Sequence, residues 1–344
     1  MRDGYQSLYR KYRPASFSEV VGQEQVTFPL QEQIASGKVS HAYFFSGSRG
    51  LGKTSVARIF ARELGTSDKD IYEIDAASNN SVDNIRSLTE NVFTLPFESK
   101  YKVYILDEVH MLSKAAWNAF LKTLEEPPAH AVFILATTEL EKVPETVRSR
   151  TQVFEFKKPT RAGLAEVITT VAKKEKYTID PSASELIALL ASGSYRDALS
   201  LVEKVISAST DKKITRTEVE KVTGAPARTL VISLLTALSL GDTQEALKTL
   251  ATAQEHDIDF DLYLTLVLES IRTVVLLRNA PDLASSIAVQ MNTDEYKEME
   301  SLAKAKDSHL SHITLLAFLD ASARMRFSPL PIVPLELAVL SLTT

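Results

Sequence analysis

The chain has 344 residues, which is enough for two or three domains, and a net charge of −5. It contains no cysteine, which excludes disulfides, thiolate nucleophiles, iron–sulfur clusters and cysteine-based zinc sites. Its apolar runs, such as 131–136, are far shorter than a membrane-spanning helix, and no apolar signal segment opens the sequence. We therefore expect a cytoplasmic protein with no membrane partner.

The negative charge is concentrated in the second half of the chain. Residues 1–158 carry equal numbers of acidic and basic residues, so the whole excess of acid lies in residues 159–344. A strongly basic surface, which is typical of nucleic-acid-binding proteins, is not indicated. Any contact with DNA must therefore depend on a few local groups.

The first 158 residues alternate between short apolar runs and segments with helical spacing. Strands are predicted at 41–46, 71–74, 102–106 and 131–136, and helices at 54–64, 81–92 and 114–125. Such an alternation predicts an α/β fold, in which a parallel sheet is covered by helices on both faces.

Beyond residue 158 the strand-like runs disappear. Helices are predicted at 161–176, 181–191, 195–208, 217–222, 227–240, 242–256, 259–278 and 306–326. We expect three domains: an α/β domain over 1–158, a small helical domain over 159–224 and a larger all-helical domain over 225–344.

A glycine-rich segment follows the first predicted strand. The chain has only 11 glycines, yet Gly47, Gly50 and Gly52 lie within six positions. The segment fits the phosphate-binding pattern G-x-x-x-x-G-K-[ST] between a strand and a helix; it reads Gly47-Ser48-Arg49-Gly50-Leu51-Gly52-Lys53-Thr54. In this motif backbone N–H groups and the helix N-terminus bind phosphate, the lysine contacts the β- and γ-phosphates, and the threonine hydroxyl binds Mg²⁺. The sequence therefore predicts a nucleotide site.

Two further predicted strands end in residues that suit the same chemistry. The strand at 102–106 is followed by Asp107, a candidate Mg²⁺ ligand, and Glu108, a candidate base for the attacking water. The strand at 131–136 is followed by Thr138, whose hydroxyl can bind the γ-phosphate or that water. A threonine that caps the next turn fits the same pattern. We interpret the nearby His110 as a packing or hydrogen-bonding residue.

Two arginines are candidates for contact with a γ-phosphate. Arg150 lies just before the expected domain boundary, and Arg196 lies at a predicted helix start in the second domain. An arginine beside the γ-phosphate accelerates hydrolysis by about 10³–10⁵-fold. Spacing alone favours a surface or ion-pair role for each, and Arg148 competes with Arg150 for the same assignment.

Together these motifs resemble the gamma/tau subunit family of the bacterial DNA polymerase III clamp loader, which belongs to the AAA+ ATPases. The pair LDEVHML and LKTLEEPP is the most specific part of the resemblance. Residues 225–344 resemble the collar domain of the family only in length and helical character. The segments that carry the resemblance are YQSLYRKYRP at 5–14, VVGQ at 20–23, GSRGLGKTSVARIF at 47–60, EIDAAS at 73–78, VYILDEVHML at 103–112, LKTLEEPP at 121–128, ATTE at 136–139 and GSYRDALSL at 193–201.

The resemblance implies a role for each candidate in ATP hydrolysis. Lys53 and Thr54 match Walker A, Asp107 and Glu108 match Walker B, and Thr138 matches the first sensor. These residues would bind ATP and Mg²⁺ and activate water.

The resemblance also assigns residues outside the central motifs. Arg196 matches the second sensor, which reports nucleotide to the small domain. Arg150 matches an arginine that reaches the ATP of the neighbouring subunit, in a Ser-Arg-Cys motif whose cysteine is replaced here by Thr151. The residues that match the segment around adenine and ribose are Tyr9, Arg13, Val20 and Val21, and those that match positions facing DNA are Arg86 and Lys122.

Two departures from the family are visible. Members usually carry four zinc-binding cysteines before the EIDAAS strand, but residues 64–70 connect the two flanking elements directly, so we predict no zinc. The chain also ends near the terminus of the family's collar domain, which favours a short, gamma-like form without the tau-type extension.

The resemblance implies an ATP hydrolase within the DNA polymerase III holoenzyme, a DNA-directed DNA polymerase. It would form a hetero-oligomeric ring with delta and delta-prime subunits and copies of itself, and load the β sliding clamp onto primer–template DNA. One alternative is a non-hydrolysing subunit of the delta-prime type, against which the intact nucleotide motifs argue. Another is a recombination-type AAA+ DNA motor, which predicts a hexamer and a C-terminal winged helix with strands. A third is an ATP-binding scaffold with negligible turnover.

Overall fold

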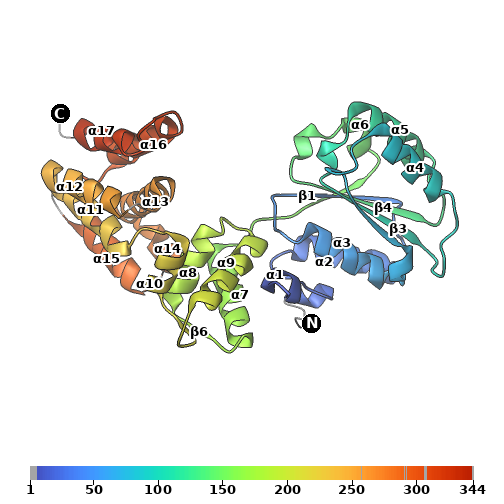
Figure 1. The fold of residues 1–344 in the computed structure, drawn as a ribbon, viewed down its shortest axis with the longest axis horizontal. Coiled ribbons are helices and arrows are strands. Elements are labelled where there is room, and N and C mark those ends of the chain that lie inside the picture. The colour runs from blue at the N-terminus through green and yellow to red at the C-terminus, as the bar shows by residue number, and fades with distance from the viewer. Residues whose placement is uncertain (1–5, 257, 290, 292, 306–307, 343–344) are drawn as a thin grey trace. The chain divides into compact units, whose positions relative to one another are not determined.

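The computed structural model describes residues 6–256, 258–289, 291, 293–305 and 308–342. These residues form two compact units (Figure 1). Unit 1 contains the described residues up to Leu164 together with Ala191–Ser200, and unit 2 contains Ala165–Leu190 and the described residues from Leu201 onward.

Unit 1 is built on a five-stranded sheet in the order β2-β3-β4-β1-β5. All four neighbouring pairs are parallel. The three central strands are almost completely buried, which explains their continuous apolar sequences. The strands are β1 (Ala42–Ser46), β2 (Ile71–Asp75), β3 (Lys102–Asp107), β4 (Ala131–Thr137) and β5 (Gln152–Glu155). The predicted parallel sheet is therefore confirmed.

Helices cover both faces of this sheet. α2 and α3 share a core with one set of side chains from the central strands, including Phe45 and Ile105. α4 and α5 pack on the opposite face against the alternate set, including Phe44 and Leu106 (Figure 1). The helices of this unit are α1 (Leu8–Lys11), α2 (Glu24–Ser36), α3 (Lys53–Glu63), α4 (Val82–Val92), α5 (Lys114–Glu125) and α6 (Glu145–Arg148), and the single 3₁₀ turns are η1 (Phe17–Glu19), η2 (Asp68–Asp70), η3 (Val109–Met111) and η4 (Leu140–Lys142).

Local signals explain where the helices of unit 1 begin. The Ser81 side chain accepts a hydrogen bond from the Asn84 backbone N–H at the start of α4, and Ser113 does the same for Ala116 at the start of α5. Such caps satisfy backbone donors that a helix leaves unpaired.

Unit 2 is helical apart from one small exception. The expectation that strands are absent beyond residue 158 is wrong at β6 (Thr178–Ile179) and β7 (Lys213–Ile214), which pair in parallel. Two-residue strands are too short to produce a visible alternation. The helices that follow α7 (Arg161–Lys174) are α8 (Pro181–Leu190), α9 (Tyr195–Ala208), α10 (Arg216–Thr223), α11 (Arg228–Leu240), α12 (Thr243–Glu255), α13 (Phe260–Asn279), α14 (Ala284–Val289), α15 (Thr293–Lys304), α16 (His312–Met325) and α17 (Val333–Ser341), with a 3₁₀ turn η5 (Pro281–Leu283).

The last third of the chain has its own apolar core. Leu234, Tyr263, Ile271, Phe318 and Leu335 are buried together between α11, α13, α16 and α17. From residue 228 to residue 342, the described part of the chain contains helices and no strand. The helix expected over 306–326 is present as α16, and residues 306–307 lie outside the described residues.

Residues 191–200 pack with the sheet domain, although the sequence assigns them to the second domain. The Tyr195 backbone N–H donates to the Gly50 carbonyl oxygen over 3.1 Å. This contact attaches the start of α9 to the glycine-rich loop. The division into three domains at 158 and 224 stays a prediction.

No single helix among the described residues has the length and apolar composition to cross a membrane. α10 and α11 satisfy that test only as a pair, and they are bent by 93° at the break between them.

Candidate nucleotide site

The glycine-rich loop joins β1 to α3 in a conformation that requires glycine. Gly47 and Gly50 have φ values of 142° and 76°, in a region that side chains disfavour. A Cβ atom on Gly47 would lie 2.7 Å from the carbonyl oxygen of Phe156, and one on Gly50 would lie 2.0 Å from Ser194 Oγ. The backbone of this loop is therefore closely surrounded, which accounts for the clustering of glycine in a chain that has few.

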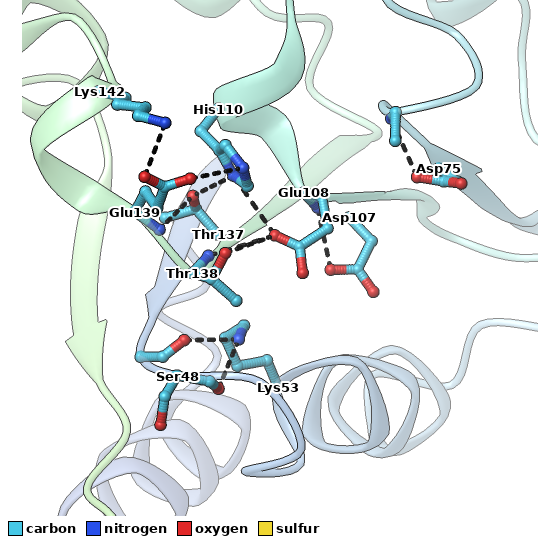
Figure 2. A network of polar contacts seen from close by, with 12 residues as sticks. Ser48, Lys53, Asp75, Asp107, Glu108, His110, Thr137, Thr138, Glu139 and Lys142 are labelled. Atoms are coloured by element: carbon cyan, nitrogen blue, oxygen red, sulfur yellow. Dashed lines mark hydrogen bonds and ion pairs between the residues drawn. The ribbon is translucent and has the colours of Figure 1, made fainter. Parts of the chain in front are cut away.

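Lys53 lies inside the loop at the first turn of α3. Its side chain is buried, with 5% exposed, and Nζ donates to the carbonyl oxygens of Gly47 (2.6 Å) and Ser48 (3.0 Å) (Figure 2). Burial lowers the pKa of Lys53, while the nearby Glu108 and Asp107 carboxylates oppose this shift. Within the described residues the ammonium forms no ion pair. A phosphate is the type of group that would satisfy it.

Leu51, Arg49 and Gly52 of the loop have different surroundings. Leu51 is 2% exposed and belongs to the core between the sheet and α3, whereas Arg49 is exposed at the surface. Gly52 has a φ of 97° and precedes the first residue of α3. The helix N-terminus therefore points its free N–H groups into the loop, where an anion is favoured.

Thr54 and Asp107 meet across the base of the loop. The Thr54 hydroxyl donates to Asp107 Oδ2 over 2.6 Å, and the backbone N–H of Glu108 donates to Asp107 Oδ1 over 3.0 Å. Hydroxyl and carboxylate oxygens suit Mg²⁺, which is usually bound by one or two protein oxygens together with substrate phosphates. The donor set therefore fits Mg²⁺. Neither here nor elsewhere do the described residues form a group of three or more His, Asp or Glu side chains that could hold a metal ion.

Glu108 follows β3 in a strained turn. Its φ is 50°, a left-handed conformation that costs a non-glycine residue free energy and is found mainly at functional sites. Glu108 Oε2 accepts hydrogen bonds from the Thr138 hydroxyl (3.0 Å) and the Thr138 backbone N–H (3.3 Å). The ends of β3 and β4 thus bring together the two residues that the sequence placed after separate strands (Figure 2).

A histidine and two further charged residues extend this group. His110 lies 3.3 Å from Glu108 Oε2 through Nδ1 and 3.2 Å from Glu139 Oε1 through Nε2. Lys142 Nζ is 2.7 Å from Glu139 Oε2, and this contact lowers the pKa of Glu139. The sequence suggested a packing or hydrogen-bonding role for His110, and the hydrogen-bonding contacts are present. It gave no role to Glu139 or Lys142, whose only signal is their position after β4.

Arg196 approaches the loop from residues 191–200. A Cβ atom added to Gly50 would lie 3.3 Å from Arg196 Cβ, and the guanidinium carbon of Arg196 lies 4.8 Å from the centre of the Tyr9 ring, within range of a cation–π contact. Tyr195 donates its hydroxyl to the Val21 carbonyl oxygen over 2.9 Å, and burial raises the Tyr195 pKa to about 12. The N-terminal segment and the start of α9 are thereby joined beside the loop.

The remaining N-terminal candidates lie in the same unit. Arg13 is half-buried, and its pKa is lowered first by burial and then by the nearby Arg58. Val20 packs against the core of the sheet and Val21 is exposed. Arg13 thus lies within electrostatic range of Arg196, while Arg58 is paired with Glu73 at 2.6 Å.

The structure does not bring Arg150 to this loop. Its guanidinium contacts Glu125 Oε1 (2.8 Å) and the Thr146 carbonyl oxygen (2.7 Å), and the side chain is 37% exposed. Its competitor Arg148 has a buried Nε with no hydrogen-bond partner. The Arg150 side chain is therefore partly accessible to a second molecule.

The two candidates for DNA contact lie on neighbouring helices. Arg86 is on α4 and forms an exposed contact with Asp83 at 3.5 Å, and Lys122 is exposed on α5.

The fold and this group of residues define a class: a P-loop nucleotide-binding protein of the AAA+ type, followed by helical domains. Family models match in the same order. Residues 66–160 match the DNA polymerase III delta subunit, 164–211 match the ATPase lid domain of the DNA polymerase III clamp loader subunit, and 214–344 match domain III of the gamma and tau subunits.

Curated relatives point to one family. The chain is 33% identical over 316 residues to the DNA polymerase III gamma subunit of Buchnera aphidicola, covering 86% of this chain and 87% of that protein. It is 39% identical over 324 residues to the DNA polymerase III tau subunit of Bacillus subtilis, covering 88% of this chain. It spans only 57% of the length of that tau subunit. The chain belongs to the gamma/tau subunit family of DNA polymerase III.

Solved structures support the fold. The RuvB Holliday junction branch migration motor of Thermotoga maritima aligns with a TM-score of 0.53 and 24% identity, covering 85% of this chain and 91% of that one. At this identity the likeness concerns the fold alone.

Proposed function

We propose that this chain is the ATPase subunit of a bacterial replicative clamp loader, which uses ATP to load the β sliding clamp onto primed DNA. The observation that carries the proposal is the convergence of Lys53, the Thr54–Asp107 pair and the Glu108–Thr138 pair at one loop, in a chain of the gamma/tau family. The site supports ATP as substrate with Mg²⁺ as cofactor.

The chain's own residues divide the work of hydrolysis. The backbone of the loop and Lys53 bind the β- and γ-phosphates, and Thr54 and Asp107 hold Mg²⁺, which offsets phosphate charge when it is bound. Thr138 donates its hydroxyl to the γ-phosphate. Glu108 orients the attacking water and polarises it toward the phosphorus.

Arg196 and the N-terminal segment couple the bound nucleotide to the rest of the chain. Arg196 lies on α9, the helix that continues into unit 2. A contact between its guanidinium and phosphate would therefore link the bound nucleotide to the lid domain over 159–224. Tyr9, Arg13, Val20 and Val21 enclose the adenine and ribose.

Arg150 acts on a neighbouring subunit in this proposal. It lies away from its own loop, and its guanidinium is accessible. An arginine supplied in trans stabilises transition-state charge. The partners are delta and delta-prime subunits and further copies of this chain, which assemble in the cytoplasm through the collar domain over 225–344. Arg86 and Lys122 contact DNA phosphates rather than bases.

The alternatives are less well supported. A non-hydrolysing subunit of the delta-prime type would not need Glu108 to lie beside Thr138, as it does here. A recombination-type motor predicts strands in a C-terminal winged helix, whereas the described residues between 228 and 342 are helical.

The test is steady-state ATP hydrolysis by the chain assembled with delta and delta-prime subunits, with and without β clamp and primed DNA. We expect strong stimulation in the wild type and about 10³-fold less turnover in Arg150→Ala. Arg62→Ala is the matched control, since Arg62 forms an exposed pair with Asp68 on the same unit. Turnover that ignores clamp and primed DNA would contradict the loader assignment.

A further inference from the structure

His110 occupies a buried position between two carboxylates. It lies on η3, the single turn that begins directly after Glu108, and its side chain is 8% exposed. Nδ1 faces Glu108 Oε2 at 3.3 Å and Thr137 Oγ1 at 3.0 Å, and Nε2 faces Glu139 Oε1 at 3.2 Å. Both ring nitrogens therefore face oxygen atoms (Figure 2). The ring donates to Glu108 and to Glu139 together in the form that carries a hydrogen on each nitrogen.

The far side of the ring is held in turn. Glu139 Oε1 faces the histidine and Glu139 Oε2 faces Lys142, while the Glu139 backbone N–H donates to Thr137 Oγ1 over 3.0 Å. The Lys142 ammonium keeps the Glu139 pKa low, so Glu139 remains an ionised acceptor. A continuous series of contacts thus runs from Glu108 through His110 and Glu139 to Lys142 at the surface.

Among the described residues, one oxygen of Glu108 makes the polar side-chain contacts. Oε2 faces the Thr138 hydroxyl, the Thr138 backbone N–H and His110. Within the described residues, Oε1 forms no hydrogen bond (Figure 2). Oε2 is therefore held by protein groups, and Oε1 can accept a hydrogen bond from water.

The Thr138 hydroxyl cannot donate to Glu108 and to a γ-phosphate at the same time. Its hydroxyl has one hydrogen, which points to Glu108 in this structure. If that hydrogen is donated to a γ-phosphate, Glu108 loses the shorter of its two contacts with Thr138. The contact with His110 does not depend on this exchange, because the ring is held by Thr137 and Glu139.

We propose that His110 is a positioning residue for ATP hydrolysis: it holds Glu108 Oε2 when Thr138 turns to the γ-phosphate, and so keeps Glu108 Oε1 directed at the attacking water. The inference rests on the proposed function and adds to it a residue that touches neither nucleotide nor water. Glu139 and Lys142 support the ring.

The first test compares three substitutions of His110 by single-turnover hydrolysis of bound ATP in the assembled complex, with ATP affinity measured separately. We expect His110→Ala to lower the rate at least about 10-fold, since small displacements of catalytic groups carry costs of this order, with ATP affinity within about twofold. His110→Asn puts an amide nitrogen near the position of Nδ1 and should recover most of the rate. His110→Gln puts it near Nε2 and should not.

His130→Ala is the matched control. His130 is a half-buried histidine of the same unit, and its Nε2 lies 2.9 Å from the Val92 carbonyl oxygen, away from the site. This variant should keep the wild-type rate. If His110→Ala and His110→Asn lose the same rate, and the loss follows a fall in the fraction of folded protein, His110 is a packing residue and the proposal is overturned.

A double-mutant cycle with Glu108→Gln asks whether His110 acts through Glu108. We expect His110→Ala to cause no further loss in the Glu108→Gln background, because residues that act as a unit are not additive. An equal loss in both backgrounds would overturn the proposal. If Glu108→Gln lowers the rate while His110→Ala does not, only this inference fails. If Glu108→Gln leaves the rate unchanged, the proposed function itself fails.

Discussion

Charged residues are used differently in the nucleotide site of unit 1 and in an ion-pair network of unit 2. In unit 1, Lys53 is buried and has only backbone carbonyl oxygens as direct partners among the described residues, and Glu108 stands on left-handed backbone with one oxygen unpaired. In unit 2, α10, α11 and α15 join through charges that satisfy one another. Arg216 pairs with Glu220 (2.9 Å) and Glu295 (2.7 Å), and Arg228 pairs with Glu298 (2.6 Å).

This difference separates charges that await a ligand from charges that hold a fold together. A buried charge without a partner is costly, so its retention in unit 1 is explained by what it binds. The network of unit 2 already has its partners. Substitutions in the first region should therefore change nucleotide binding more than stability, and substitutions in the second should do the reverse.

The largest effect is expected for Lys53→Met. Removing the cation should weaken ATP binding about 100-fold, or roughly 2.7 kcal/mol, because it takes one member from a buried charge pair with phosphate. The unliganded chain should become more stable, since the buried charge is replaced by an apolar group. Titration with a fluorescent ATP analogue and urea unfolding measure the two quantities. A parallel loss of affinity and stability would contradict this account.

Lys53 should also make the stability of the chain depend on pH. The pKa of Lys53 is lowered in the folded state from its ordinary value of 10.5, so the unfolded chain binds this proton more tightly. The contribution of Lys53 to the free energy of unfolding is therefore lowest below its folded-state pKa, and it rises as the pH approaches 10.5. In urea unfolding across this pH range, the difference in stability between Lys53→Met and the wild type should shrink as pH increases.

The next effect is expected for Arg216→Met in unit 2. Arg216 and Glu220 are only 16% and 13% exposed, so removing the cation leaves buried carboxylate charge and should cost about 2 kcal/mol of stability. ATP affinity should not change. Arg324→Met is the control, since Arg324 and Asp320 form a pair that is mostly exposed and worth at most about 1 kcal/mol. A large loss of ATP affinity in Arg216→Met would break the separation between the two regions.

The smallest effect is expected for Glu125→Gln. The Arg150–Glu125 pair is exposed on both sides, so stability should change by less than about 0.5 kcal/mol. Stimulated ATP turnover of the assembled complex should rise by up to about fivefold, because the carboxylate no longer competes with phosphate for Arg150. A fall in turnover would instead mean that Glu125 aims Arg150 rather than retaining it.

Much of unit 1 was predictable from the sequence because its central strands are buried on both faces. β3 and β4 read as continuous apolar runs, and the glycine-rich loop has a fixed pattern. The strand β5 was missed because it is a short edge strand with mostly exposed residues. Helix α2 was missed as well; it contains Pro29 and has a weak apolar face.

The site was predictable where a motif sits within one segment. Lys53 and Thr54 share a loop, and Asp107 and Glu108 share a turn. The contacts between segments were not predictable from spacing: Arg196 reaches Tyr9 only because residues 191–200 pack on Gly50. His110 likewise gains its partners from the end of β4. Such contacts depend on the sheet order, which one sequence does not state.

Hydrogen exchange with and without MgATP tests the central claim most directly, because it reports where the nucleotide acts. We predict slower exchange in 47–54 and 191–200 of the wild type, with no change in α11 and α12 and none anywhere in Lys53→Met. Slower exchange that is confined to unit 2, or that persists unchanged in Lys53→Met, would contradict the assignment of this site.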